Sequence, residues 1–220
     1  MSSKLFRSIE LLLALSLAPV LFVSTAQAVS LGFGCISNNL AGDCAIGEAQ
    51  ISVEVTDLGG GQVQFDFMNS GPNASSITDV YFDDGTLLGI SSLIDADDGV
   101  GGDPGVDFSG GSAAPPNLPA GSMASPPFVA TTGFLADSDP PPASMGVNPG
   151  EWLGVIFNLQ GGGSFADILA ELTSGELRIG VHLQALASGG SESFVNVPIP
   201  EPGTVLLMGL GLAVLARRRI

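Results

Sequence analysis

Residues 51–67, ISVEVTDLGGGQVQFDF, decide the fold of this 220-residue chain. Apolar and polar residues alternate on both sides of the glycine triplet at 59–61. Alternation with period 2 is typical of strands that bury one face, and a glycine-rich turn between two such runs indicates an antiparallel hairpin. The side chains expected to face the core are Ile51, Val53, Val55, Val63, Phe65 and Phe67.

Further strands are expected on both sides of a long irregular segment. They are predicted at residues 77–82, 86–90, 128–135, 151–159, 177–186 and 193–197. Short strands separated by glycine-rich turns are typical of all-β proteins. The sequence therefore predicts an antiparallel β-sandwich or jelly roll.

One short helix interrupts this pattern. Ser164 and Asp167 have the spacing of a capping box, and Gly175 suits the position just after a helix. One apolar face follows, made of Phe165, Ile168, Leu169 and Leu172. We expect this helix to plug one end of the β-domain or to cross between its sheets.

The segment 95–149 is rich in Gly, Pro and Asp, and we expect it to be a long irregular connection that contains one strand. This connection is called the excursion below. Its carboxylates lie among glycines and could bind Ca²⁺ through hard oxygen ligands. The candidates are Asp95, Asp97, Asp98, Asp103 and Asp107. Their spacing is not that of an EF-hand, so a solvated acidic loop is the other interpretation. No other cofactor is expected.

Charge and cysteine content restrict the function. Between Val29 and Ile199, Arg178 is the only basic residue among 20 acidic ones. This imbalance repels phosphate backbones, so no nucleic-acid partner is expected. Cys35 and Cys44 lie close in sequence without the His or second Cys pair of a zinc site, and predict a disulfide in an oxidising compartment.

Residues 1–28 have the pattern of a secretory signal peptide. Lys4 and Arg7 precede an apolar run at 11–23, and Ala26-Gln27-Ala28 forms a small-x-small cleavage site. We expect the signal helix to be removed after Ala28. This leaves residues 29–197 as a domain outside the cytoplasm.

The last residues, 198–220, form a second export-related segment. Pro200-Glu201-Pro202 precedes an apolar run at 203–216, which ends at Arg217, Arg218 and Arg219. As a helix, this run spans about 21 Å at about 1.5 Å per residue. A bilayer core is about 30 Å thick, so we expect a transient inner-membrane anchor with its arginines in the cytoplasm. A permanent single-span anchor is the alternative.

This order of triplet, apolar helix and arginine cluster resembles the PEP-CTERM sorting signal of Gram-negative bacteria, a tail also known as the ice-binding protein C-terminal domain. The resemblance covers about a tenth of the chain. It implies that an exosortase, a membrane-embedded processing enzyme, recognises Pro200, Glu201 and Pro202. It further implies that residues 203–216 are the transient membrane anchor and that Arg217–Arg219 stop translocation. Release to the cell surface or medium, often alongside exopolysaccharide, is implied as well.

No catalytic constellation is evident between the two ends. His182 is the single histidine, and we expect it on the outer face of its strand with Arg178 and Gln184. No G-x-S-x-G elbow is present, and Trp152 is expected to pack in the core. The sequence therefore predicts a non-enzymatic structural or adhesive surface protein. The alternative is a binding module for polysaccharide, Ca²⁺ or ice, the last disfavoured because the chain has a single adjacent Thr pair, Thr131-Thr132.

Overall fold

The computed structural model describes residues 27–84, 88–95, 105–111 and 116–198. The strands are β1 (Ala28–Cys35), β2 (Ile51–Gly59), β3 (Gln62–Asn69), β4 (Ser76–Asp83), β5 (Leu88–Asp95), β6 (Phe108–Gly110), β7 (Leu135–Ser138), β8 (Trp152–Leu159), β9 (Arg178–Gln184) and β10 (Glu192–Asn196). The helices are α1 (Ala41–Gln50), α2 (Pro142–Met145), α3 (Phe165–Ser174) and the short 3-10 helix Gly121–Met123.

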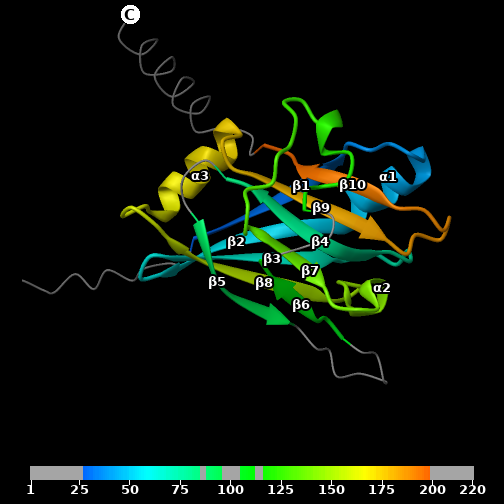
Figure 1. Cartoon of the computed structure of the whole chain (residues 1–220), viewed down its shortest axis with the longest axis horizontal. Coiled ribbons are helices and arrows are strands. Elements are labelled where there is room, and N and C mark those ends of the chain that lie inside the picture. The colour runs from blue at the N-terminus through cyan, green and yellow to red at the C-terminus, as the bar shows by residue number, and fades with distance from the viewer. Residues whose placement is uncertain (1–26, 85–87, 96–104, 112–115, 199–220) are drawn as a thin grey trace, which may run out of the picture.

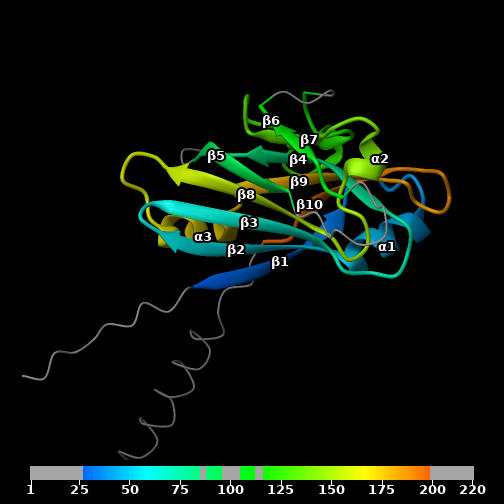
Figure 2. The same cartoon turned by 90° about the horizontal axis from the view of Figure 1, so that it is seen from below.

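All strand pairs are antiparallel, and the strands form one continuous sheet in the order β5-β8-β3-β2-β1-β10-β9-β4-β7-β6. Figures 1 and 2 show this sheet folded over on itself. Strand β1 belongs to both parts, because it pairs with β2 along its first residues and with β10 along its last. The predicted all-β antiparallel class is confirmed. Below, β5-β8-β3-β2 is the β2–β3 half and β10-β9-β4-β7-β6 is the β4–β9 half.

The predicted hairpin is present as β2 and β3. Val53 opposes Phe67 and Val55 opposes Phe65 across the ladder. Each of Gly59, Gly60 and Gly61 has a positive φ, a backbone conformation that costs glycine little and other residues more. The glycine triplet therefore turns the chain and fixes the register that places the apolar residues on one face.

The core lies between the two halves of the sheet. The Phe82 ring of β4 contacts Phe65 of β3 at 5.3 Å and Phe157 of β8 at 4.7 Å between centroids, both edge to face. All three side chains are fully buried. Such aromatic pairs add about 0.5–1.5 kcal/mol each beyond their burial, so this cluster is a strong contact between the halves.

The predicted helix is confirmed as α3. Ser164 and Asp167 form the expected capping box, with the Ser164 backbone N–H donating to Asp167 Oδ2 at 2.7 Å. Gly175 ends the helix in the left-handed conformation. Phe165, Ile168 and Leu172 are buried in the core shared by both halves, which is how a short amphipathic helix is stabilised.

The excursion differs from its prediction. No strand forms at 128–134, and the excursion holds two short strands instead of one, β6 and β7, the second of which begins at Leu135. Leu118 and Phe128 instead pack on the outer side of the β4–β9 half, against Tyr81 and Leu135. The excursion therefore covers a sheet face. Five further elements were not anticipated from the sequence: β1, α1, β6, the 3-10 helix Gly121–Met123 and α2.

In the ranges that the structure describes, no helix combines the length and apolarity needed to cross a bilayer. Residues 1–26 of the predicted signal peptide and the predicted anchor at 203–216 lie outside those ranges.

Candidate functional site

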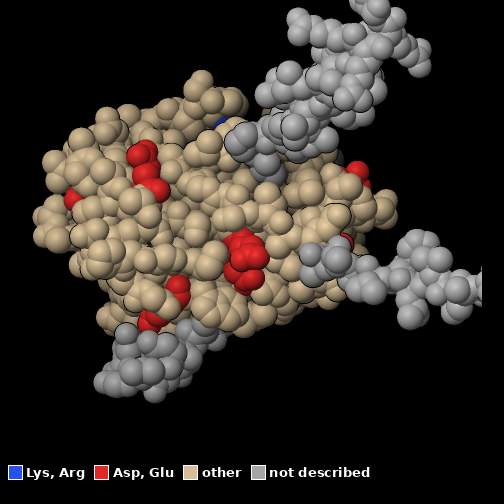
Figure 3. Space-filling view, turned by 180° about the vertical axis from the view of Figure 1, so that it is seen from behind, with Lys and Arg blue, Asp and Glu red and all other residues tan. Residues whose placement is uncertain are grey.

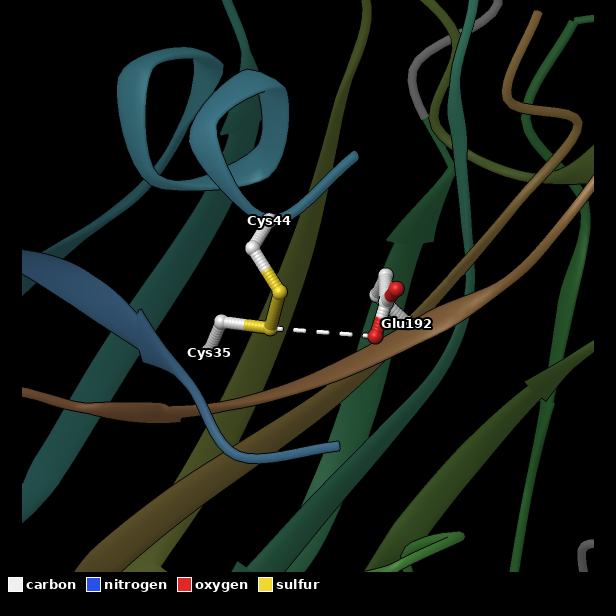
Figure 4. Close-up of side chains that lie close together, drawn as sticks. All are labelled: Cys35, Cys44 and Glu192. Atoms are coloured by element: carbon white, nitrogen blue, oxygen red, sulfur yellow. Dashed lines mark hydrogen bonds between the residues drawn. A yellow bond between two sulfur atoms is a disulfide. The ribbon is translucent and has the colours of Figure 1, made fainter. Parts of the chain in front are cut away.

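The predicted disulfide links the end of β1 to the first turn of α1. Cys35 and Cys44 are joined with their Cα atoms 5.4 Å apart, and the Glu192 carboxylate lies beside them (Figure 4). Oε2 of Glu192 is 3.7 Å from Sγ of Cys35. A disulfide sulfur has no proton to donate and is not the thiolate that binds metals. The arrangement is therefore a structural clamp.

Glu192 holds the loop that enters α1. Its carboxylate accepts hydrogen bonds from the backbone N–H groups of Asn39, at 3.0 Å, and Leu40, at 2.6 Å. The Ser37 hydroxyl donates a third. The side chain is 1 % exposed, so these bonds replace the water that a carboxylate requires. Sequence reasoning missed this residue, because its partners at residues 37–40 are distant in the sequence.

His182 lies on the outer face of β9 with Arg178 and Gln184, as expected, but its side chain is buried there instead of exposed. The imidazole is 9 % exposed, and its Nδ1 lies 3.0 Å from Ser193 Oγ on the neighbouring strand β10. The imidazole is buried because β9 is covered on both sides: Leu118 and Phe128 lie so close to Gly180 that no other side chain fits there without movement. Burial lowers the pKa of His182, and the nearby charge of Glu192 partly opposes this shift.

Polar residues continue from His182 across the β4–β9 half. Its ladder partner on β4 is Asp79, which opposes Asp137 on β7. Asp79 accepts hydrogen bonds from Thr78 Oγ1 at 2.7 Å and Tyr81 OH at 3.3 Å. Burial raises the pKa of the Asp79 carboxyl despite these bonds. The row is a buried hydrogen-bonded network, which specifies the packing of the strands.

The Ser193–His182 pair resembles two members of a hydrolytic triad in residue type. Ser193 is only 1 % exposed, and its backbone N–H donates to the Ser37 hydroxyl. A catalytic serine must reach the substrate carbonyl. The pair is closed to a substrate approaching from solvent.

Arg178 links the part of the excursion that contains Pro126 and Pro127 to the sheet. Its guanidinium pairs with Asp83 and donates to the carbonyls of Pro126, at 2.6 Å, and Pro127, at 2.7 Å. It also lies 5.4 Å from the centre of the Phe128 ring. The cation thus joins two strands and the excursion through one planar group.

A cavity of about 430 Å³ lies where the described chain ends. It is lined by Gly34, Cys35, Ile36, Ala124, Ser125, Pro126, Ser174, Gly175, Arg178, Val195, Asn196, Val197 and Pro198. Most of this surface is apolar, and Arg178 is the one charged residue among the described residues that line it.

Trp152 lies on the outer face of the β2–β3 half, and the expectation that it packs in the core is wrong. Its side chain is 37 % exposed. A Cβ placed on Gly154 would be 3.1 Å both from the Trp152 ring and from Asp66 Oδ1, so the glycine lets ring and carboxylate lie close together. Gln64 Nε2 donates to Asp66 at 2.7 Å. Burial, with a smaller contribution from Glu54, raises the pKa of Asp66.

The predicted Ca²⁺ ligands are not brought together in the described ranges. Asp97, Asp98 and Asp103 lie outside them, and only the backbone of Asp95 is described, at the end of β5. Asp107 is exposed, and its N–H donates to the Met145 carbonyl at 2.9 Å. The Ca²⁺ site stays a prediction. On the face in Figure 3, acidic residues form separate small patches.

Most sorting residues also lie beyond the described chain. Ala26, Pro200, Glu201, Pro202, Arg217, Arg218 and Arg219 are among them. Ala28 is described: it is the exposed first residue of β1 and pairs with Thr56 of β2.

Comparison with known families identifies the tail. The PEP-CTERM protein-sorting motif matches residues 198–220, so the chain carries a PEP-CTERM sorting tail at its C-terminus. Comparisons with curated proteins and with solved structures found no match.

Proposed function

We propose that this chain is an exported, non-catalytic surface or extracellular protein that an exosortase sorts through residues 198–220. The observation that carries the proposal is the PEP-CTERM motif at those residues. The inner membrane holds the tail transiently, the enzyme cuts near Pro200-Glu201-Pro202, and the β-sandwich-like body is released to the surface or the surrounding matrix.

Properties of the body support this route. The Cys35–Cys44 disulfide suits an oxidising compartment, where thiols do not stay reduced. The excess of acidic over basic residues between Val29 and Ile199 keeps an exported protein dispersed. The closed environment of Ser193 and His182 supports a structural or adhesive role over hydrolysis.

A processing experiment tests the sorting step. The full chain is produced in a bacterium that contains an exosortase and in the same strain lacking it. We expect a shortened, surface-associated or released product only in the first. Replacing all three residues of Pro200-Glu201-Pro202 by Ala should leave the tail attached, whereas the control Glu176→Ala, at an exposed position, should be processed normally. Equal processing with and without the triplet would refute the proposal.

A second candidate function is polysaccharide binding at the outer face of the β2–β3 half. The half-exposed ring of Trp152 lies beside Asp66, whose partner Gln64 adds an amide. A sugar ring has apolar C–H groups on its faces and polar hydroxyl groups around its edge. It therefore binds to an apolar aromatic surface that has hydrogen-bonding groups beside it.

The test is retention of the purified protein on exopolysaccharide from the producing cells. We expect Trp152→Ala to weaken retention by about tenfold, on the order of 1.4 kcal/mol. The matched control is Leu58→Ala, which removes another exposed apolar side chain. Lack of retention of the unaltered protein, or equal losses in both variants, would eliminate this candidate.

A further inference from the structure

The first part of β1 has one side of its backbone open. β1 pairs with β2 through Ala28–Gly32 but with β10 only through Phe33–Cys35, and the last bond to the C-terminal segment runs from Val197 N–H to Gly32 O at 2.9 Å. Within the described chain, no residue pairs with Ala28 or Ser30 on that side. Both are exposed.

The hydrogen-bond pattern shows which residues of β1 direct their backbone N–H and C=O groups to this open side. Ile36 donates to Ser193 O, and Gly32 accepts from Val197, so even-numbered residues of this segment face β10. Gln27 O accepts from Asp57 N–H, so odd-numbered residues face β2. Because antiparallel ladders alternate strictly, Ala28 and Ser30 direct their N–H and C=O groups to the open side.

The sequence after β10 fits that side in one register. Phe33 opposes Asn196, so continuing the ladder places Ile199 opposite Ser30 and Glu201 opposite Ala28. In this register both odd-numbered residues present an N–H to β1. Pro198, Pro200 and Pro202 alternate with them, and their missing N–H groups face away from β1. Proline is tolerated on such an outer edge, where it also blocks the addition of another strand.

We propose that the open edge of β1 at residues 28–31 binds residues 199–202 of this same chain as a continuation of β10. The inference rests on the proposed function, in which those residues contain the sorting triplet. In the chain that still carries its signal peptide, docking places Glu201 beside Ala28. After the expected cut behind Ala28, the pair of Ser30 with Ile199 remains.

Amide exchange in the full 220-residue chain, held in detergent micelles and followed by NMR, tests the docking directly. Ile199 and Glu201 are the amides to follow, since the residues between and beside them are prolines. We expect their exchange to be slowed at least about tenfold relative to unstructured peptide. Exchange of both at the unstructured rate overturns the proposal.

Substitutions at Ser30 supply the matched pair. Ser30→Pro removes the N–H on the open side and leaves the β1–β2 hydrogen bonds intact, whereas Ser30→Ala keeps the N–H. We expect Pro to abolish the protection of Ile199 and Ala to preserve it. Protection that survives in Ser30→Pro, with β9 and β10 still protected, contradicts the proposal.

Cross-linking decides the question if Ser30→Pro does not fold. Val29 and Pro200 are opposed in this register at a non-hydrogen-bonded pair, where side chains are closest. The variant Val29→Cys/Pro200→Cys should form a disulfide, and the slipped variant Val29→Cys/Glu201→Cys should not. Equal disulfide yields in the two variants contradict docking.

Normal exosortase cutting of a chain whose tail amides are unprotected would refute docking alone and leave the proposed function standing.

Discussion

Nδ1 of His182 lies 3.0 Å from Oγ of Ser193 between β9 and β10, in a place where the imidazole is nearly excluded from water. Burial lowers the pKa of His182 because the charged imidazolium loses hydration. The folded state therefore binds a proton less readily than the unfolded state. Its stabilising contribution is complete above the ordinary pKa of about 6.5 and is lost as the pH falls through the folded value.

Replacing this histidine should change the acid side of the stability profile. We expect the free energy of unfolding to fall less between pH 7 and pH 5 in His182→Gln than in the unaltered protein. Urea unfolding at several pH values provides the measurement. Parallel curves for the two proteins would show that the imidazole is hydrated or charged in the fold.

Asp79 should have an effect of opposite sign. Burial raises the pKa of its carboxyl, so the folded state binds this proton more tightly than the unfolded state. Its contribution is favourable below the ordinary pKa of about 3.9 and declines as the pH rises through the folded value. Asp79→Asn should therefore reduce the loss of stability between pH 4 and pH 7.

Asp167 supplies the control for that experiment. Hydrogen bonds from Ser164 lower the pKa of its carboxyl, so its contribution is present above the ordinary pKa and disappears as the pH falls. Asp167→Asn should alter the pH profile in the opposite direction to Asp79→Asn. The same direction in both variants would contradict the assignment of their environments.

Glu192 should be the most sensitive acid near the disulfide. The N–H groups of Asn39 and Leu40 donate to different oxygens of Glu192, and Glu192→Gln replaces one of these oxygens by an NH₂ group that cannot accept, so one N–H loses its acceptor. We expect a loss of about 1–3 kcal/mol in the free energy of unfolding. The exposed Glu176→Gln is the control, with a change within about 0.5 kcal/mol. Thermal and urea unfolding measure both, and equal small changes would mean that the loop is held by the disulfide alone.

Arg178 should not be replaceable by lysine. Its guanidinium reaches Asp83 and the carbonyls of Pro126 and Pro127 together, and a single ammonium lacks this fork geometry. We expect Arg178→Lys to destabilise the fold by about 1.5–3 kcal/mol. It should also increase proteolysis within 116–130. A lysine variant as stable and as resistant as the original would contradict the role given to this cation.

The hairpin and α3 could be predicted because each is encoded locally. Alternation around Gly59-Gly60-Gly61 sets both strands, and the Ser164–Asp167 capping box with Gly175 bounds the helix. These signals need no knowledge of distant contacts, and the structure agrees with them closely.

Elements that depend on distant partners could not be predicted. Helix α1 contains Gly42 and Gly47, which weaken helix propensity. Gly47 is required there because the Phe194 ring occupies the space of any side chain. That ring comes from β10, far along the sequence, so no local pattern indicates the helix.

The burial of His182 and the exposure of Trp152, neither of which was anticipated, have one common origin. Periodicity indicates which residues share a face, but it does not say what covers that face. Leu118 and Phe128 cover the outer side of β9, whereas the outer side of β8 leaves Trp152 half exposed. The excursion covers the outer face near His182 and leaves Trp152 uncovered. Its path depends on tertiary packing, because its sequence has little hydrophobic periodicity.

Export with removal of the PEP-CTERM tail is tested most directly by the intact mass of the protein recovered from the cell surface and medium of the native bacterium. The account predicts a chain that begins at Val29 and ends before the apolar run at 203–216, with the Cys35–Cys44 disulfide formed. An uncut chain of 220 residues, recovered as soluble protein from the cytosol, would contradict it.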